Sequence, residues 1–138
     1  MSRIHQAVIL TGAIALGIAS SDSDAQQLVK ATLLSNAIRL DTSQVKPGVV
    51  TLVVHNAADN DMVHELVVLK TDAADGALPV QKGQVSEATF KKVGEVEDVA
   101  PGKSKRFAIK LAPGHYVVIC NKPGHYSMGM HASLSVVP

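Results

Sequence analysis

The stretch HYVVICNKPGHYSMGMHASLSVV, residues 115–137, consists of an apolar run, a short loop and a second run in which apolar and polar residues alternate. Both runs are rich in β-branched residues, and the loop between them contains a Pro-Gly turn. The first run ends in Cys120, the only cysteine of the chain, and the loop holds His125, Met128 and Met130. The stretch therefore predicts two β-strands joined by a loop that carries sulfur and imidazole groups.

The rest of the chain repeats this pattern of short strands and turns. Four Pro-Gly pairs mark turns, and runs rich in β-branched residues lie between them. Many short strands separated by turn signals predict an all-β protein, either a β-sandwich or a β-barrel. The further predicted strands are 48–56, 64–72 and 105–111, with one or two more in 30–40.

One segment, at about residues 73–98, departs from this pattern. It is polar and mixed, and no period of two survives in it. Within it, residues 86–92 (SEATFKK) can form a short helix, because Ser86 is a plausible N-cap residue. We expect this polar insert to be a long connection that crosses from one sheet to the other.

Residues 1–25 have the three-part layout of a secretory signal peptide. Arg3 precedes an uncharged apolar run, Ala7–Ala19, and a polar stretch with small residues follows. The run is shorter than the roughly 20 residues that a membrane span needs, although an uncleaved N-terminal anchor is an alternative. We expect cleavage after Ala25 and a single mature domain, residues 26–138, without a membrane span.

Export and charge restrict what the mature domain does. Removal of the signal takes away one basic and two acidic residues, which changes the net charge from +1 to about +2. This near-neutral balance gives no indication of binding to nucleic acid or to anionic lipid. The periplasm, or another extracytoplasmic compartment, is oxidising, and an exposed free thiol is unfavourable there. Cys120 is therefore expected to be buried or bound.

Three interpretations of Cys120 are open from the residues alone. It is a packed core residue, a nucleophile or a metal ligand. As a nucleophile it has His125 as a possible base, but no evident oxyanion hole, and Asn121 is too close in sequence for a usual third partner. As a metal ligand it joins imidazole and thioether groups, whereas structural zinc sites take four Cys or His ligands. A His₂Cys set with a weak axial Met is typical of blue copper.

The blue-copper pattern requires a second histidine from elsewhere in the chain. His5 leaves with the signal, and His55, His115 and His131 lie at predicted strand ends that are commonly exposed. His64 begins an apolar strand after a loop, so it can reach the Cys120 loop from one end of a sandwich. The alternative for His64 is a loop histidine that faces solvent.

The C-terminal loop resembles that of the cupredoxins, the type 1 copper proteins, and particularly the rusticyanin, auracyanin and sulfocyanin-like branch. That branch has the spacing C-x-x-P-G-H-x-x-x-G-M, which runs here from Cys120 through His125 to Met130, and its upstream histidine matches His64. The resemblance covers about residues 46–138. It implies a Greek-key sandwich and one type 1 copper ion held by His64, Cys120, His125 and Met130.

Met128 and Glu65 are the two positions that bear on this resemblance. Met128 also has a spacing that occurs in cupredoxins, but the branch resembled here uses the later methionine, so Met128 is expected at the rim. Many cupredoxins have Asn after the upstream histidine, and its side chain ties the ligand loops together. This chain has Glu65 there, so that strap is in doubt, although the backbone N–H is expected to reach the sulfur. Asn121 is a candidate to replace the strap.

A fixed set of three ligands and one weak ligand leaves no open coordination position, so we do not expect an enzyme. We expect a monomeric electron-transfer protein whose transient redox partners dock on a small apolar patch around His125. The alternative is a periplasmic copper carrier or chaperone, which the absence of a Met- or His-rich run disfavours. A copper-free sandwich used for protein contact is a third possibility. The predicted patch comprises Pro123, Gly124, Tyr126 and Met128, with Lys122 at its rim.

Overall fold

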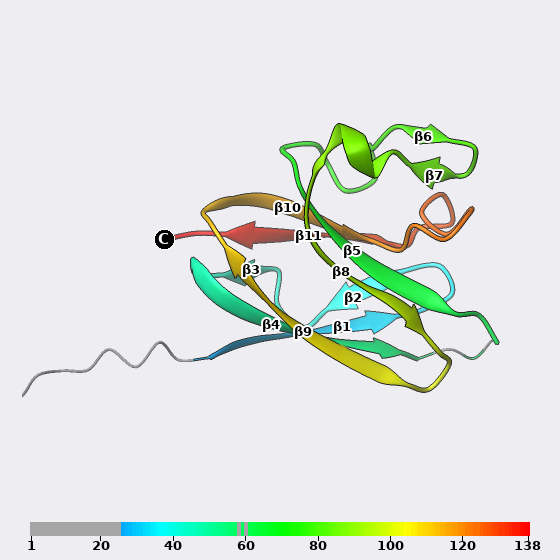
Figure 1. The fold of residues 1–138 in the computed structure, drawn as a ribbon, viewed down its shortest axis with the longest axis horizontal. Helices are drawn as coiled ribbons and strands as arrows, with labels where there is room; N and C mark the ends of the chain where they lie inside the picture. Colours follow the sequence, from blue (N-terminus) through cyan, green and yellow to red (C-terminus); the bar gives the residue numbers. More distant parts are fainter. Residues whose placement is uncertain (1–25, 58, 60) are drawn as a thin grey trace, which may run out of the picture.

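The computed structural model describes residues 26–57, 59 and 61–138. The predicted signal peptide lies outside these residues. The described chain is built from β-strands in two larger sheets and a small hairpin, and its one helical element is a single 3-10 turn, η1 (Glu87–Thr89) (Figure 1). The predicted all-β sandwich is confirmed.

The first sheet has four strands in the order β2-β1-β4-β9. Strand β1 runs parallel to β4, whereas β1–β2 and β4–β9 are antiparallel pairs. The long central pairing joins β4 to β9 from Gly48–Leu111 to His55–Ser104. The bounds are β1 Gln27–Leu33, β2 Ile38–Leu40, β4 Gly48–Asn56 and β9 Ser104–Leu111.

The second sheet has five strands in the order β3-β11-β10-β5-β8. Its centre consists of β10, which pairs antiparallel with both β11 and β5. The end of β10 therefore lies beside the start of β5 and the start of β11. The bounds are β3 Gln44–Val45, β5 His64–Lys70, β8 Lys91–Val99, β10 Gly114–Ile119 and β11 His131–Val136.

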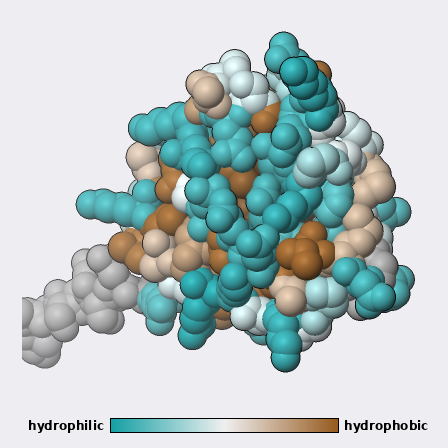
Figure 2. Space-filling model, turned by 45° about the vertical axis from the view of Figure 1, so that its right-hand side comes forward, coloured by the Kyte–Doolittle hydropathy of each residue, from teal (hydrophilic) through white to brown (hydrophobic). Residues whose placement is uncertain are grey.

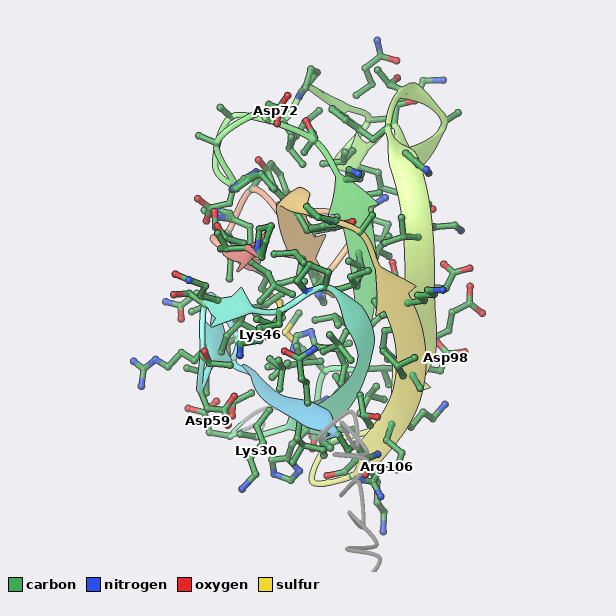
Figure 3. The ribbon with its side chains drawn as sticks, turned by 90° about the vertical axis from the view of Figure 1, so that its left-hand side faces the viewer. Lys30, Lys46, Asp59, Asp72, Asp98 and Arg106 are labelled. Carbon is green, nitrogen blue, oxygen red and sulfur yellow. The ribbon has the colours of Figure 1, made fainter. Side chains whose placement is uncertain are left out.

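The main hydrophobic core fills the space between the two sheets, as the end-on view shows (Figure 3). Charged residues such as Lys30 and Arg106 are exposed outside it. Alternation along each strand sends every second side chain inward, so the predicted apolar faces of β9 and β11 contribute to this core. Its buried members are Val29, Ala31, Leu33, Ile38, Val45, Val50, Leu52, Val54, Leu66, Val68, Val99, Leu111, Tyr116, Val118, Cys120, Met130, Leu134 and Val136.

A second apolar cluster covers the outer face of the second sheet. The segment between β5 and β8, residues 71–90, folds over that face and is called the cap segment below (Figure 1). It contains η1 and the hairpin of β6 (Val80–Gln81) and β7 (Gln84–Val85). The cluster joins residues of β5, β10, the cap segment and the Cys120 loop: Val67, Leu69, Leu78, Val85, Val117, Ile119 and Tyr126.

The expectation that residues 73–98 are a connection crossing from one sheet to the other is wrong, because the segment ends in a strand of the same sheet as β5. Residues 91–99 form β8, an edge strand paired with β5, and the crossing to the first sheet follows it at a turn closed by Lys103 N–H and Ala100 C=O at 3.0 Å. The expected helix is the short η1 turn. Two residues of β8 lie opposite the single residue Glu65, and Asp98 there has φ +50°, so a β-bulge interrupts the alternation.

The surface is mostly hydrophilic, with small separate hydrophobic areas in the view of Figure 2. Among the described residues, no helix has the length and hydrophobicity to cross a bilayer. The large apolar side chains that are exposed belong to different elements, so they do not by themselves define one broad patch. They are Leu28, Val49, Val63, Val80, Met128 and Val137.

Candidate metal centre

Strand register brings two of the predicted ligands to one point. Strands β5 and β10 are antiparallel, with Ile119 opposite Val67, so Cys120 lies beyond the last pair, close to the start of β5. His64 occupies that start. By the period of two, His64 shares the inward face of β5 with Leu66, and Cys120 belongs to the same core. Both residues are fully buried.

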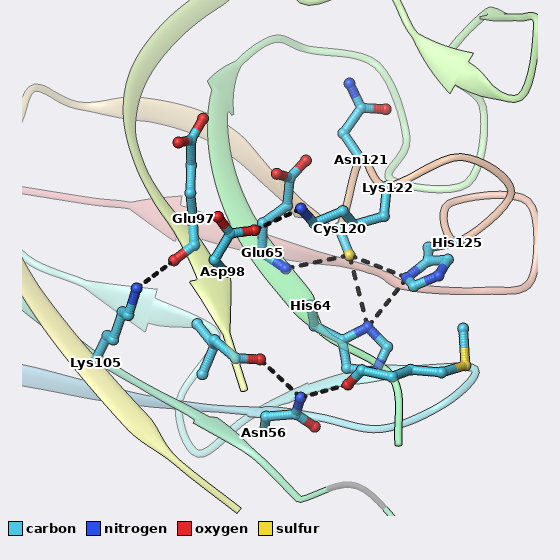
Figure 4. A network of polar contacts seen from close by, with 12 residues as sticks. Asn56, His64, Glu65, Glu97, Asp98, Lys105, Cys120, Asn121, Lys122 and His125 are labelled. Atoms are coloured by element: carbon cyan, nitrogen blue, oxygen red, sulfur yellow. Dashed lines mark hydrogen bonds and ion pairs between the residues drawn. The ribbon is translucent and has the colours of Figure 1, made fainter. Parts of the chain in front are cut away.

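Three potential ligand atoms converge there (Figure 4). The Nδ1 atoms of His64 and His125 are 3.1 Å apart. The Sγ atom of Cys120 lies 3.8 Å from His64 Nδ1 and 3.4 Å from His125 Nδ1. His125 is 8% exposed, so the group sits just beneath the surface. The structure therefore brings together the three strong ligands predicted from the sequence.

These distances fit a single first-row metal ion. A point in the plane of the three atoms lies about 2.0 Å from each of them, compared with metal bonds of about 2.0 Å to histidine nitrogen and about 2.3 Å to cysteine sulfur. One thiolate and two imidazoles in a trigonal arrangement are the donor set of blue copper. In addition, His64 Nε2 is buried and has no hydrogen-bond partner among the described residues, so the polar contacts of that ring are made by Nδ1.

The two methionines of the loop differ sharply. Met130 is fully buried in the main core, whereas Met128 is 48% exposed. Cys120 N–H donates to Met130 C=O at 3.1 Å, which continues the β10–β11 pairing by one residue pair. Antiparallel partners project to the same face of a sheet, so the Met130 and Cys120 side chains share the inward face. Met128 lies at the rim, as expected.

Consecutive turns shape the loop between Cys120 and β11. His125 N–H donates to Lys122 C=O at 2.9 Å, and Met130 N–H donates to His125 C=O at 3.2 Å. Gly129 has φ +113°, and a Cβ atom there would lie 2.5 Å from the Asn36 carbonyl oxygen. Glycine is therefore required both by the backbone conformation and by the close approach of the turn between β1 and β2.

Backbone donors surround the thiol. Glu65 N–H donates to Cys120 Sγ at 3.4 Å, as predicted. Burial raises the pKa of the Cys120 thiol, while hydrogen bonds from the backbone N–H groups of Glu65 and Lys122 act in the opposite direction. The thiol is thus protonated at neutral pH until a metal ion replaces the proton.

Burial also sets the charge of the two histidines. It lowers the pKa of His64, and the nearby His125 lowers it further. Burial lowers the pKa of His125 as well, with a second contribution from the positive charge of Lys122. Both rings therefore favour the neutral form, which is the form that binds a metal.

Glu65 and its neighbours form a charged edge beside the centre. Burial raises the pKa of the Glu65 carboxyl, whereas Lys122 and a hydrogen bond from the Asn121 backbone N–H lower it. Glu65 therefore interacts with the Cys120 loop through Asn121 and Lys122, even though many cupredoxins have Asn at this position. Lys122 Nζ lies 2.7 Å from Asp98 Oδ1, on the bulge of β8 (Figure 4).

The remaining described histidines lie outside this cluster, as expected for all three. They are partly buried and have other partners. His55 Nδ1 lies 2.7 Å from Ser104 Oγ, His115 Nδ1 lies 2.6 Å from the Thr71 carbonyl oxygen, and His131 Nδ1 lies 2.6 Å from Asp75 Oδ2.

Two supporting residues have roles that the sequence analysis did not predict. Asn56 is fully buried, and its Nδ2 donates to Met62 C=O at 2.8 Å and to Val99 C=O at 2.9 Å, which fixes the loop that precedes His64. The signal available in the sequence was a polar residue, Asn56, at the C-terminal end of an apolar strand. Tyr126 was placed in the exposed docking patch, and this is wrong, because it is 4% exposed and packs beneath the cap segment.

The fold and the site define a β-sandwich that holds one metal ion between a thiolate and two imidazoles. A sequence profile of the copper binding proteins of the plastocyanin/azurin family matches residues 19–137. The chain belongs to this family, the cupredoxins. The residues present and the family together make the bound group one type 1 copper ion.

Solved structures with the same fold include members of the branch that the loop spacing indicated. Auracyanin from the photosynthetic bacterium Roseiflexus castenholzii has a TM-score of 0.59 and 21% identity, covering 83% of this chain and 99% of that one. Auracyanin B has a TM-score of 0.58 and 25% identity, covering 81% and 89%. Rusticyanin from Thiobacillus ferrooxidans has a TM-score of 0.57 and 14% identity, covering 82% and 79%. No curated protein matches the sequence.

Proposed function

We propose that this chain is an exported type 1 copper protein that transfers single electrons, with His64, Cys120, His125 and Met130 as its ligands. The observation that carries the proposal is the triangle of Nδ1, Nδ1 and Sγ atoms, whose centre lies at metal-bond distance from all three corners. The buried thioether of Met130, on the same face as Cys120, supports its role as the fourth, weak ligand.

The ligand set favours electron transfer over catalysis. Bound copper supplies a one-electron change between Cu(I), which prefers soft ligands, and Cu(II), which prefers nitrogen and oxygen. The ligands come from the ends of paired strands and a hydrogen-bonded loop, so the protein resists rearrangement between the two states. Three strong ligands and Met130 leave no position for a substrate or an activated water, which argues against an enzyme.

His125 is the proposed contact with redox partners, because it is 8% exposed, whereas His64 and Cys120 are fully buried. Pro123 and Met128 are exposed beside it, and they form a smaller docking patch than the one first expected. Small patches suit transient redox contacts between a monomer and its partner. The proposal of export rests on the layout of residues 1–25.

Copper titration tests the site. Addition of Cu(II) to the purified mature protein is expected to give an intense blue colour, produced by the bond between the thiolate and copper. The variant Cys120→Ser keeps a similar volume and removes the thiolate, so it is expected to stay colourless. A colourless wild-type complex, or a blue Cys120→Ser complex, contradicts the type 1 assignment.

Electrochemistry distinguishes a shuttle from a copper carrier. An electron-transfer protein is expected to give a reversible one-electron wave, fast self-exchange and slow loss of Cu(I) to a competing chelator. A carrier releases Cu(I) readily and exchanges electrons slowly. Blue protein that transfers its copper faster than its electrons supports the carrier.

A further inference from the structure

The cap segment, residues 71–90, contacts the Cys120 loop at three points that bracket His125. These contacts arise from Asn121, Gly124 and Tyr126, two of which are nearly fully buried. The cap segment follows β5, the strand that begins with His64. One continuous stretch of chain therefore supplies a ligand and then returns over the loop that carries the other ligands.

The first contact is the side chain of Asn121, which pairs with Val85 of β7 as a neighbouring strand would. Val85 N–H donates to Asn121 Oδ1 at 2.8 Å, and Asn121 Nδ2 donates to Val85 C=O at 2.9 Å. The same Nδ2 donates to Glu87 Oε1 at 3.1 Å, and Gln84 Nε2 donates to Asn121 C=O at 2.8 Å. Asn121 directly follows Cys120, so these bonds fix the end of the loop at the thiol.

The second contact joins two backbones. Gly124 N–H donates to Gly83 C=O at 2.8 Å, between β6 and β7. Gly83 has φ +78°, and a Cβ atom there would lie 3.3 Å from the Gly124 nitrogen. The hairpin of the cap segment thus lies directly against the residue that precedes His125.

The third contact is the hydroxyl of Tyr126, which lies on the other side of His125. It donates to Asp75 C=O at 2.7 Å and accepts from Leu78 N–H at 2.9 Å. The ring packs in the apolar cluster on the outer face of the sheet. Removal of the hydroxyl leaves the buried Leu78 N–H without its partner, which is unfavourable.

We propose that the cap segment acts as a strap, meaning that it holds the Cys120 loop in place through hydrogen bonds. Asn121 and Tyr126 are the positioning residues of this strap, and they keep Cys120 and His125 at ligand distance before the metal binds. The strap complements the bond from the Asn121 backbone to Glu65. The predicted effect of the strap on copper release rests on the function proposed above. Its predicted effect on the order of the metal-free loop does not, since every contact is made within the polypeptide.

The test compares two conservative variants of the same chemistry. Tyr126→Phe removes the hydroxyl that bonds to the cap segment. Tyr116→Phe removes a hydroxyl that donates to Ala112 C=O at 2.8 Å, at the other end of β10. Amide hydrogen exchange of the metal-free proteins reports on the Gly124 and Leu78 N–H groups, and release of Cu(I) to an excess of chelator reports on the site. Asn121→Ala provides a second variant of the strap.

Tyr126→Phe and Asn121→Ala are expected to increase exchange at Gly124 and to release Cu(I) about 10-fold faster than wild type, with altered intensity of the blue absorption band. Tyr116→Phe is expected to lower stability with none of these effects. If both strap variants match Tyr116→Phe in exchange and in release, the strap is wrong. A wild-type protein that does not turn blue overturns the proposed function instead, and the exchange measurement on metal-free protein still decides the strap.

Discussion

Cys120 and Met130 are cross-strand neighbours: the Cys120 N–H donates to the Met130 carbonyl at 3.1 Å, one residue pair beyond the β10–β11 ladder. Their side chains face the core together, and each is fully buried. Cys120 and Met130 are thus the paired residues on either side of a nine-residue loop, and backbone pairing directs both side chains to the same face of the sheet. The arrangement makes the later methionine the fourth ligand in our proposal.

Replacement of Met130 tests that assignment. Met130→Leu removes the thioether and keeps most of the volume, so Cu(II) loses a weak donor and Cu(I) is favoured. We expect the reduction potential to rise by roughly 60 mV or more, equivalent to about a tenfold change in the equilibrium constant. Voltammetry measures the shift. The matched variant Met128→Leu, at the exposed rim, is expected to leave the potential nearly unchanged, and the reverse pattern would make Met128 the ligand.

Glycine at position 129 is predicted to be essential for the loop. Gly129→Ala adds a Cβ atom 2.5 Å from the Asn36 carbonyl oxygen at φ +113°. We expect a loss of about 2–4 kcal/mol in the free energy of unfolding, from strain and steric overlap together. Gly48→Ala is the control, because Gly48 has φ +126° and open space around its Cβ position. Equal losses in denaturant unfolding of the two variants would show that the contact with Asn36 is unimportant.

Metal binding is predicted to release a proton. The pKa values of His64 and His125 lie below their ordinary value of 6.5, and that of Cys120 lies above 9.0. Between these limits the rings are neutral and the thiol is protonated, so binding releases about one proton and affinity rises about tenfold per pH unit. Calorimetric titration with Zn²⁺ in two buffers of different ionisation enthalpy near pH 7.5 measures the proton count. Cys120→Ser is expected to release none.

The hydrogen bond between Asp75 of the cap segment and His131 of β11 is predicted to give a pH-dependent contribution to stability. A hydrogen bond from His131 lowers the pKa of the Asp75 carboxyl below 3.8. The contribution is present above the unfolded pKa and disappears as the pH falls through the folded one. Asp75→Asn is expected to reduce the free energy of unfolding by less than about 1 kcal/mol at neutral pH, because the pair is partly exposed.

Urea unfolding of Asp75→Asn at neutral and at acidic pH measures that contribution. The difference from wild type is expected to vanish once the carboxyl is protonated in both the folded and the unfolded state. Asp72→Asn, in the same segment, controls for the loss of one negative charge. A difference that persists at low pH would assign the effect to packing.

The loop of the proposed copper site was predictable because its information is local. Cys120, His125 and Met130 lie within one short loop, and their spacing needs no knowledge of the tertiary structure. His64 was harder, since its approach depends on the pairing of β5 with β10, and the resemblance to cupredoxins supplied it. The alternation of apolar and polar residues predicted the strands that bury one face, and these strands together indicated the sandwich.

The segment after β5 was less predictable for physical reasons. Strand β8 is an edge strand with charged residues and a bulge at Glu97 and Asp98, so its period of two is interrupted. The bonds of Asn121 to Val85 involve the backbone of a distant residue, and any residue type except proline offers the same N–H and C=O groups. The resemblance to cupredoxins therefore suggested Asn121 as the residue that ties the ligand loops together, but it did not identify the hydrogen-bond partner of that side chain.

The complete burial of Cys120 also affects the protein before it acquires its ion. Peroxides and foreign disulfides attack thiolates that they can reach, and this sulfur is both protonated and covered by protein. Oxidative damage must therefore wait for a local opening of the fold, so a newly made molecule keeps its thiol intact while it waits for metal.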